Sequence, residues 1–245
     1  MHRGYITEVF VSFQGEGLHV GRRQLFIRFA GCNLRCRYCD TPGSLERVGA
    51  YQVHDANGAV RRGSNPVTVE ELVQLASAII ADFGQVDGVA LTGGEPLLQS
   101  DFIVRLLGDP RIPRPRLLET NGMLPERLAE VLPELDAVSM DIKIASNTGE
   151  PAFWDEHERF LTLARGKAYV KILVDDETRI DEIARAGRLV ARCAPETPVY
   201  LQPITSPDAR VHVSSRTIST LFAELRRNLA DVRVVPQTHK MLGIS

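Results

Sequence analysis

Short apolar segments with the pattern of buried strands alternate along this chain with segments that have the spacing of amphipathic helices. In 68–83, for example, Leu72 and Ile79 fall on one side, and Thr68 is a suitable N-cap. The alternation predicts an α/β fold, with a mostly parallel sheet whose strands are joined by right-handed crossovers. About six or seven such units can close, or nearly close, a barrel. We expect strands at 25–29, 88–91, 116–118, 137–140, 168–174, 199–202 and 232–235, and helices at 68–83, 102–107, 126–132, 154–164, 180–190 and 214–226.

The composition of the chain is that of a globular protein. The chain has 245 residues, of which 44% are hydrophobic, and its formal net charge is −2. This suits a single globular domain over 1–245, and it predicts neither a nucleic-acid nor a membrane partner. The chain opens MHRGYITEVF without an apolar signal region, and it holds four cysteines. We therefore expect a reducing, cytoplasmic location.

Three of the cysteines are clustered. Cys32, Cys36 and Cys39 have the spacing C-x3-C-x2-C on the loop after a predicted strand. An iron–sulfur cubane needs four ligands, so this loop would leave one iron open, as at a catalytic metal position. The alternatives are a disulfide or a structural zinc site, but zinc wants four ligands and no second CxxC or HxxxH pair occurs. Cys193 stands apart and is interpreted as an ordinary half-buried thiol.

Polar motifs follow several predicted strands, where ligands bind in parallel α/β folds. In 92–96 (TGGEP), the glycines let the backbone approach a ligand, and their carbonyls together with Glu95 are expected to receive the ammonium of a bound amino acid moiety. In 118–122 (LETNG), Glu119 and Asn121 face the same mouth, or else form an Asn-Gly turn with Glu119 in water.

The next strand ends carry further polar residues. Asp141 and Lys143 share a face, and either contact a ligand or form a salt bridge. Lys171 and Gln202 interrupt apolar strands, which favours positions facing the barrel mouth.

The N-terminal region offers an amide, a carboxylate and a cation in Gln14, Glu16 and Arg28. Together they suit a fused heterocycle that carries a carboxylate, because arginine binds carboxylates bidentately and glutamate accepts from ring N–H groups. Alternatively, Arg28 only neutralises Glu16.

Two segments interrupt the pattern. The excursion at 42–66 contains a possible hairpin with a primed turn at 56–59, and is either a lid or an inert insertion. Near the C-terminus, the run 237–240 (QTHK) is either part of a pocket or a disordered tail with a surface histidine.

The motifs described above form one set, which runs from residue 12 to the last residue: SFQGEG, GCNLRCRYCDT, TGGEPLLQ, ETNG, DIK, LQP and QTHKMLG. This set closely resembles the 7-carboxy-7-deazaguanine synthase family of radical S-adenosylmethionine (SAM) enzymes. The resemblance implies an open partial (β/α) barrel of about six parallel strands. It also implies ring contraction of 6-carboxy-5,6,7,8-tetrahydropterin to 7-carboxy-7-deazaguanine, with loss of ammonia, in queuosine biosynthesis. The implied cofactors are a [4Fe-4S] cluster, SAM and Mg²⁺.

The resemblance also assigns roles. The cluster ligands would be Cys32, Cys36 and Cys39, and Thr41 would bind Mg²⁺. Contacts to SAM would come from Tyr38, Cys39, Asp40, Gly94, Asp141, Ile142, Lys143 and Gln202. Contacts to the substrate would come from Phe13, Gln14, Gly15, Glu16, Arg28, Thr92 and the Ser245 carboxylate. The catalytic set would be Glu16, Arg28, Glu119 and His239.

The implied partners are a small pterin substrate, an electron donor such as flavodoxin or ferredoxin, and a second copy in a homodimer. Two other functions stay open at this point. One is an activase of the same superfamily that makes a glycyl radical on a partner protein. The other is a non-catalytic protein with a cysteine-bound metal.

Overall fold

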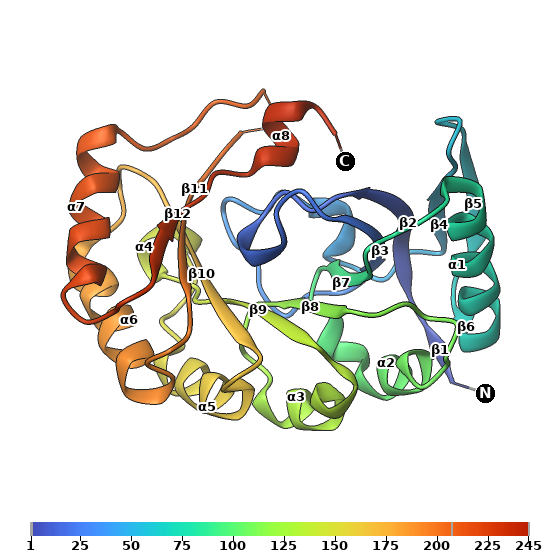
Figure 1. Ribbon diagram of the computed structural model, residues 1–245, viewed down its shortest axis with the longest axis horizontal. Helices are drawn as coiled ribbons and strands as arrows, with labels where there is room; N and C mark the ends of the chain where they lie inside the picture. Colours follow the sequence, from blue (N-terminus) through green and yellow to red (C-terminus); the bar gives the residue numbers. More distant parts are fainter. Residues whose placement is uncertain (1, 207, 245) are drawn as a thin grey trace.

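The computed structural model describes residues 2–206 and 208–244. Its centre is a curved sheet of ten strands (Figure 1). In spatial order the strands are β12 (Val232–Val234), β11 (Val199–Pro203), β10 (Ala168–Val174), β9 (Ala137–Asp141), β8 (Arg116–Thr120), β7 (Val89–Gly93), β3 (Arg23–Phe29), β2 (Ile6–Phe13), β4 (Ala50–His54) and β5 (Val60–Ser64).

All the pairings from β12 to β3 are parallel, which confirms the predicted partial barrel. β2 then runs antiparallel to β3, β4 runs parallel to β2, and β5 runs antiparallel to β4. Within the described residues, β12 and β5 are the two ends of the sheet, so the barrel is open.

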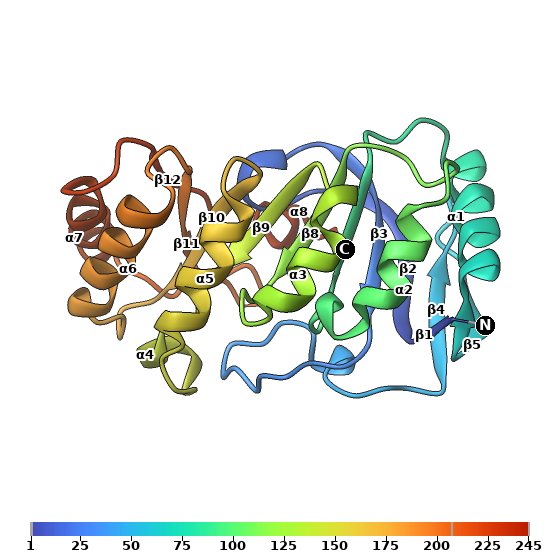
Figure 2. The same ribbon diagram turned by 90° about the horizontal axis from the view of Figure 1, so that it is seen from below.

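Six helices cover the convex side of the sheet (Figures 1 and 2). They are α1 (Val69–Phe83), α2 (Ser100–Leu107), α3 (Pro125–Val131), α5 (Trp154–Ala164), α6 (Ile180–Cys193) and α7 (Ser215–Arg226). Two short helices, α4 (Ala145–Thr148) and α8 (Thr238–Leu242), lie near strand ends, and β1 (Arg3–Gly4) pairs with β6 (Val67–Thr68). No described helix has the length and apolarity that crossing a membrane requires.

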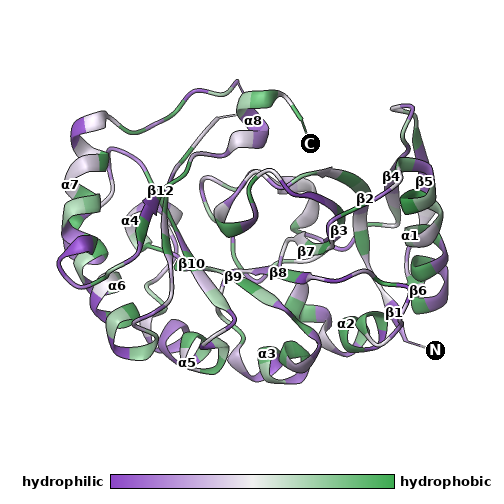
Figure 3. Cartoon of the chain, in the orientation of Figure 1, coloured by the Kyte–Doolittle hydropathy of each residue, from purple (hydrophilic) through white to green (hydrophobic). Residues whose placement is uncertain are grey.

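Local signals explain why these elements form. Thr68 caps α1 through a capping box, in which its hydroxyl accepts from Glu71 N while the Glu71 carboxylate accepts from Thr68 N. The helices are striped with apolar and polar residues (Figure 3), and their apolar stripes pack on the sheet in one large core. A smaller apolar cluster fills part of the barrel interior, with Phe10, Phe26, Ala90, Leu117, Ala137, Tyr169 and Tyr200.

Every predicted strand and helix is present, with bounds that differ by a few residues at most. The strand β2 was not predicted. The hairpin in the excursion at 42–66 is confirmed, but the primed turn is wrong. Asp55 accepts from Asn57 N and Ala59 N, and Gly58 alone in this loop has a positive φ, at 80°. The hairpin continues the sheet beyond β2 instead of covering a site.

Candidate active site

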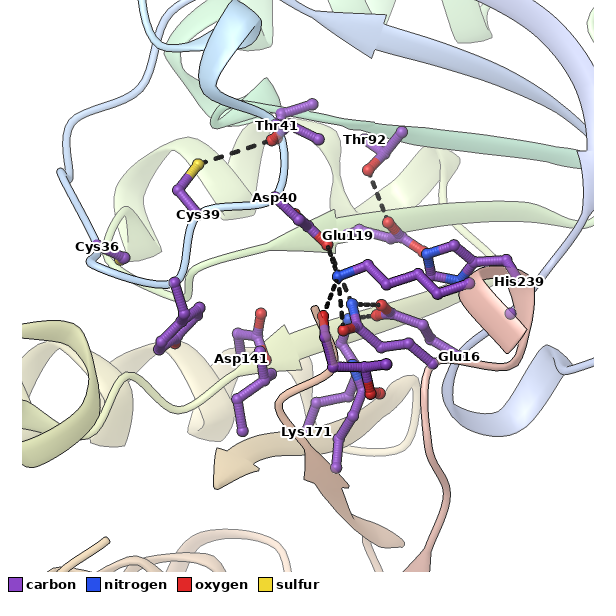
Figure 4. Close-up of a pocket in the computed structure, with 18 of the residues that line it drawn as sticks. Glu16, Cys36, Cys39, Asp40, Thr41, Thr92, Glu119, Asp141, Lys171 and His239 are labelled. Atoms are coloured by element: carbon purple, nitrogen blue, oxygen red, sulfur yellow. Dashed lines mark hydrogen bonds and ion pairs between the residues drawn. The ribbon is translucent and has the colours of Figure 1, made fainter. Parts of the chain in front are cut away.

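A cavity of about 910 Å³ opens at the carboxyl ends of the parallel strands. The cysteine loop forms one side of it, and Glu16, Glu119 and His239 lie on the other (Figure 4). The strand ends of β7, β8, β9, β10 and β11 form its floor. This is the position where parallel α/β folds bind ligands.

The three clustered cysteines all line this cavity. Burial raises the pKa of Cys36 to about 11 and also raises the pKa of Cys32, so these thiols need a cation to hold them as thiolates. Backbone contacts fix the loop, because Gly31 N donates to Ser44 O (2.8 Å) and the Arg35 guanidinium donates to Cys32 O (2.8 Å). The three cysteine thiols therefore suit a cofactor with several metal cations, such as an iron–sulfur cluster.

The number of clustered thiols argues against a structural zinc site, which takes four ligands. The cavity lining holds three cysteines, and the one group of three potential ligand atoms found within 4.8 Å of one another in the described part of the chain is Glu16, Asp40 and His239, which contains no cysteine. Three thiolates suit a cubane that leaves one iron open.

The glycine turn after β7 brings the backbone close to the cysteine loop. A Cβ on Gly94 would lie 2.2 Å from Gly31 O and 2.6 Å from Ser44 O, so this position accepts only glycine. Gly93 has a φ of 120°. The turn thus presents bare backbone to the cavity, as predicted.

The prediction for Glu95 is wrong. This side chain is fully buried and does not line the cavity. It accepts hydrogen bonds from Leu97 N (3.0 Å), Thr120 Oγ1 (2.9 Å) and Asn121 N (2.8 Å). Burial raises the pKa of Glu95 to about 7, although these hydrogen bonds oppose the rise. Glu95 therefore ties the turn to the end of β8 instead of receiving a ligand.

The wall beside the cysteines has polar atoms without protein partners. Asp141 forms the anticipated salt bridge to Lys143 Nζ (2.9 Å), but its Oδ1 is buried and, in the described chain, unpaired. The amide of Gln202 is fully buried, and neither its nitrogen nor its oxygen has a partner among residues 2–206 and 208–244. Such groups are costly unless a ligand or water satisfies them. Since Asp141 and Gln202 line the same cavity as the cysteines, these atoms fit a polar cosubstrate such as SAM.

Most residues predicted to contact SAM line the cavity, namely Tyr38, Cys39, Asp40, Gly94, Asp141, Lys143 and Gln202. Ile142 does not. Its side chain is buried in the main core, and its N–H donates to Lys171 O (3.0 Å). Alternation along the strand explains this, since neighbours Asp141 and Lys143 point the other way.

The opposite wall holds a buried ion pair. Lys171 Nζ bonds Glu16 Oε2, and the side chains are only 6% and 13% exposed. Burial alone would raise the pKa of Glu16, but the charge and hydrogen bond of Lys171 hold it below its usual range. Glu16 is therefore ionised at neutral pH. The alternative in which Arg28 neutralises Glu16 is wrong, because Arg28 Nε bonds Glu8 Oε2 at 2.7 Å.

Glu119 is held inside the cavity and does not lie in water. Its Oε1 accepts from Gln14 Nε2 (2.9 Å) and its Oε2 accepts from Thr92 Oγ1 (2.6 Å). The predicted substrate residues Phe13, Gln14, Gly15, Glu16, Arg28, Thr92, Glu119 and His239 all line the cavity. Ser245 lies outside the described residues.

The C-terminal run is a docked wall of the cavity and not a free tail. Gln237 is buried and its Nε2 donates to Glu16 Oε1 (2.8 Å) and Asp40 Oδ2 (3.0 Å). Lys240 Nζ donates to Gln237 Oε1 (2.8 Å), and Thr238 N donates to Gly15 O (3.0 Å). Gln237 and Lys240 are not among the predicted site residues, although both belong to the QTHK motif.

Removing residues 243–245 is expected to lower turnover by at least about tenfold, because Gly243 and Ile244 line the cavity and help to exclude water. Steady-state kinetics on the truncated enzyme, normalised to iron content, measures the effect. Full activity would show that the tail is a spectator.

Comparison with known proteins agrees with this site. Residues 26–175 match the family model described as the radical SAM superfamily. A 7-carboxy-7-deazaguanine synthase from Geobacter sulfurreducens is 38% identical over 242 residues, which cover 97% of this chain and 96% of that protein. One from Methanothermobacter thermautotrophicus is 34% identical over 99% of this chain and 98% of that protein. This chain belongs to the 7-carboxy-7-deazaguanine synthase family.

Solved structures support the fold of this 7-carboxy-7-deazaguanine synthase family member. A crystal structure of QueE from Escherichia coli matches with a TM-score of 0.59 and 21% identity, covering 97% of this chain and 95% of that chain. A radical SAM methyltransferase from Sphaerobacter thermophilus matches with a TM-score of 0.59 and 14% identity, over 94% of this chain and 77% of that chain.

Proposed function

We propose that this enzyme converts 6-carboxy-5,6,7,8-tetrahydropterin to 7-carboxy-7-deazaguanine by ring contraction with loss of ammonia. The observation that carries the proposal is one cavity with two unlike walls. One wall holds Cys32, Cys36 and Cys39, and the other holds Arg28 and Glu119. A glycyl-radical activase would share the first wall but has no use for the second.

The first wall would hold the cofactors. The three cysteines would bind a [4Fe-4S] cluster, with Asp40, Gly94 and Gln202 around SAM. When bound, cluster and SAM supply a one-electron cleavage of the sulfonium that starts radical chemistry by hydrogen abstraction. Lys143 keeps its charge, since Asp141 raises the pKa of this buried amine well above its usual range against the effect of burial.

The second wall would orient the pterin. Arg28, Glu16 and Glu119 line the cavity. Arg28 would bind the substrate carboxylate, and Glu16 and Glu119 would accept hydrogen bonds from ring N–H groups. Lys171 keeps Glu16 in its accepting form. His239 and the tail close the pocket on this side, which keeps water from reactive species.

Three further assignments belong to this proposal. Thr41 is proposed to give its hydroxyl to Mg²⁺, because Thr41 lines the cavity between the two walls and Mg²⁺ prefers oxygen ligands. Reduction of the cluster is proposed to come from flavodoxin or ferredoxin. The active form is proposed to be a homodimer in which residues 1–245 of each copy form one catalytic domain.

The test of the second wall is Arg28→Ala. We expect kcat/KM to fall by about 10²-fold or more, because a charge-assisted bidentate contact is lost, while iron content and SAM binding stay unchanged. Anaerobic kinetics with iron analysis measures both. Loss of iron in proportion to activity would contradict the assignment of Arg28 to the substrate.

A further inference from the structure

Arg28 lines the cavity, and its side chain is bound by Glu8, which does not line the cavity. Glu8 lies opposite Arg28 in the β2–β3 ladder, and its Oε2 accepts from Arg28 Nε at 2.7 Å. With Nε occupied, the Nη1–Nη2 edge of the guanidinium carries no hydrogen bond within the described residues. That edge has the fork geometry that binds a carboxylate.

The hairpin of the excursion supplies a second support. His54, at the end of β4, places Nε2 at 3.3 Å from Glu8 Oε1. Its ring also meets the Phe10 ring edge-on, with centroids 6.0 Å apart. His54 therefore contacts both Glu8 and Phe10, the two residues that contact the Arg28 guanidinium.

Phe10 is the second residue that contacts Arg28. Its ring lies 5.4 Å from the Arg28 guanidinium carbon and stacks on Phe26, with centroids 5.1 Å apart. Both rings and Arg28 line the cavity, whereas Glu8 and His54 do not. The side chains of Arg28, Glu8 and His54 are 18%, 30% and 30% exposed, so the group lies partly shielded from water.

From this arrangement we infer that Glu8 and His54 are positioning residues that fix Arg28 for the carboxylate of the pterin. The hairpin at 50–64 is thus a specificity element of the site and not an inert insertion. A guanidinium held by Glu8 at Nε and by Phe10 at its face, both braced by His54, loses little conformational freedom when it binds a ligand, which favours carboxylated pterins over uncarboxylated ones. The inference rests on the proposed function, because it takes the substrate carboxylate to bind at Arg28.

The experiment measures ligand binding without turnover. Cluster-loaded enzyme with SAM, but without reductant, is titrated calorimetrically with 6-carboxytetrahydropterin and with tetrahydropterin that lacks the carboxylate. The variants are Glu8→Gln, His54→Phe, which keeps a ring against Phe10, and His54→Gln, which keeps an N–H near Glu8. Glu70→Gln is the control, because Glu70 lies on α1, pairs with the exposed Arg111 and does not line the cavity.

We expect Glu8→Gln to weaken binding of the carboxylated ligand by about tenfold and His54→Phe by about threefold, with His54→Gln close to wild type. Binding of the uncarboxylated ligand and iron content should not change. In turnover assays, KM should rise while kcat changes by less than about twofold.

Two results would overturn the inference alone: wild-type affinity in Glu8→Gln, or an equal loss for both ligands. Wild-type enzyme that makes no deazapurine would overturn the proposed function and this inference together. The two failures are thus distinguishable.

Discussion

Replacing Cys36 with alanine is expected to abolish cluster assembly and to reduce turnover by at least about 10³-fold. Two thiolates from this loop cannot hold three irons of a cubane, and burial already disfavours free thiolates here. Iron and sulfide analysis, visible absorbance and product formation after anaerobic reconstitution measure the effect.

The matched control is Cys193→Ala. Cys193 is buried at the end of α6 and does not line the cavity, so this variant should keep about four irons per chain and full turnover. A Cys36→Ala enzyme that still binds four irons would contradict the assignment. So would tight retention of zinc in place of iron, which would favour a non-catalytic cysteine–metal protein.

Lys171→Met is expected to lower the free energy of unfolding by about 3–5 kcal/mol at about pH 7, because it leaves the Glu16 carboxylate buried without its cation. Turnover should fall as well, since Glu16 loses its fixed geometry against Gln237. Urea unfolding of the cluster-free protein measures the stability change. Arg179→Met, which removes an exposed ion pair with Asp181, should leave stability unchanged.

The pH dependence has a definite sign. In the wild type the pKa of Glu16 is below its usual range, so the ion pair stabilises the fold above the unfolded-state pKa, and this stabilisation is lost as pH falls toward the native pKa. In the variant the lowering effect of Lys171 is gone, and burial, the largest influence on the pKa of Glu16, favours its protonation against the Gln237 hydrogen bond. The stability difference between the two proteins should therefore be smaller at about pH 5 than at about pH 7. A constant difference would show that Lys171 acts by packing and not by charge.

Sequence reasoning recovers the regular elements well, because their signals are local. The apolar spacing and capping box of α1 are readable from 68–83 alone. The cysteine loop and glycine turn are likewise short motifs that the fold places at strand ends. The strand β2 is missing from the predicted elements, because its end overlaps the SFQGEG motif, whose polar residues indicate a ligand site and not a strand.

Pairings between distant residues were not readable. Glu16 and Lys171 are 155 positions apart, whereas Arg28 is near Glu16 in sequence and was the obvious partner to consider. Glu95 illustrates another limit: its turn motif does not reveal that three protein donors surround it in the interior. The contact between Glu8 and His54 joins strand β2 to the excursion at 42–66, and no motif in that segment indicates its partner.

The most direct test of the central claim is product formation by the reconstituted, reduced enzyme with SAM and 6-carboxytetrahydropterin under anaerobic conditions. The structure and the family predict one 7-carboxy-7-deazaguanine and one ammonia for each pterin consumed. Intact clusters and bound SAM without any deazapurine product would contradict the account and would favour an activase instead.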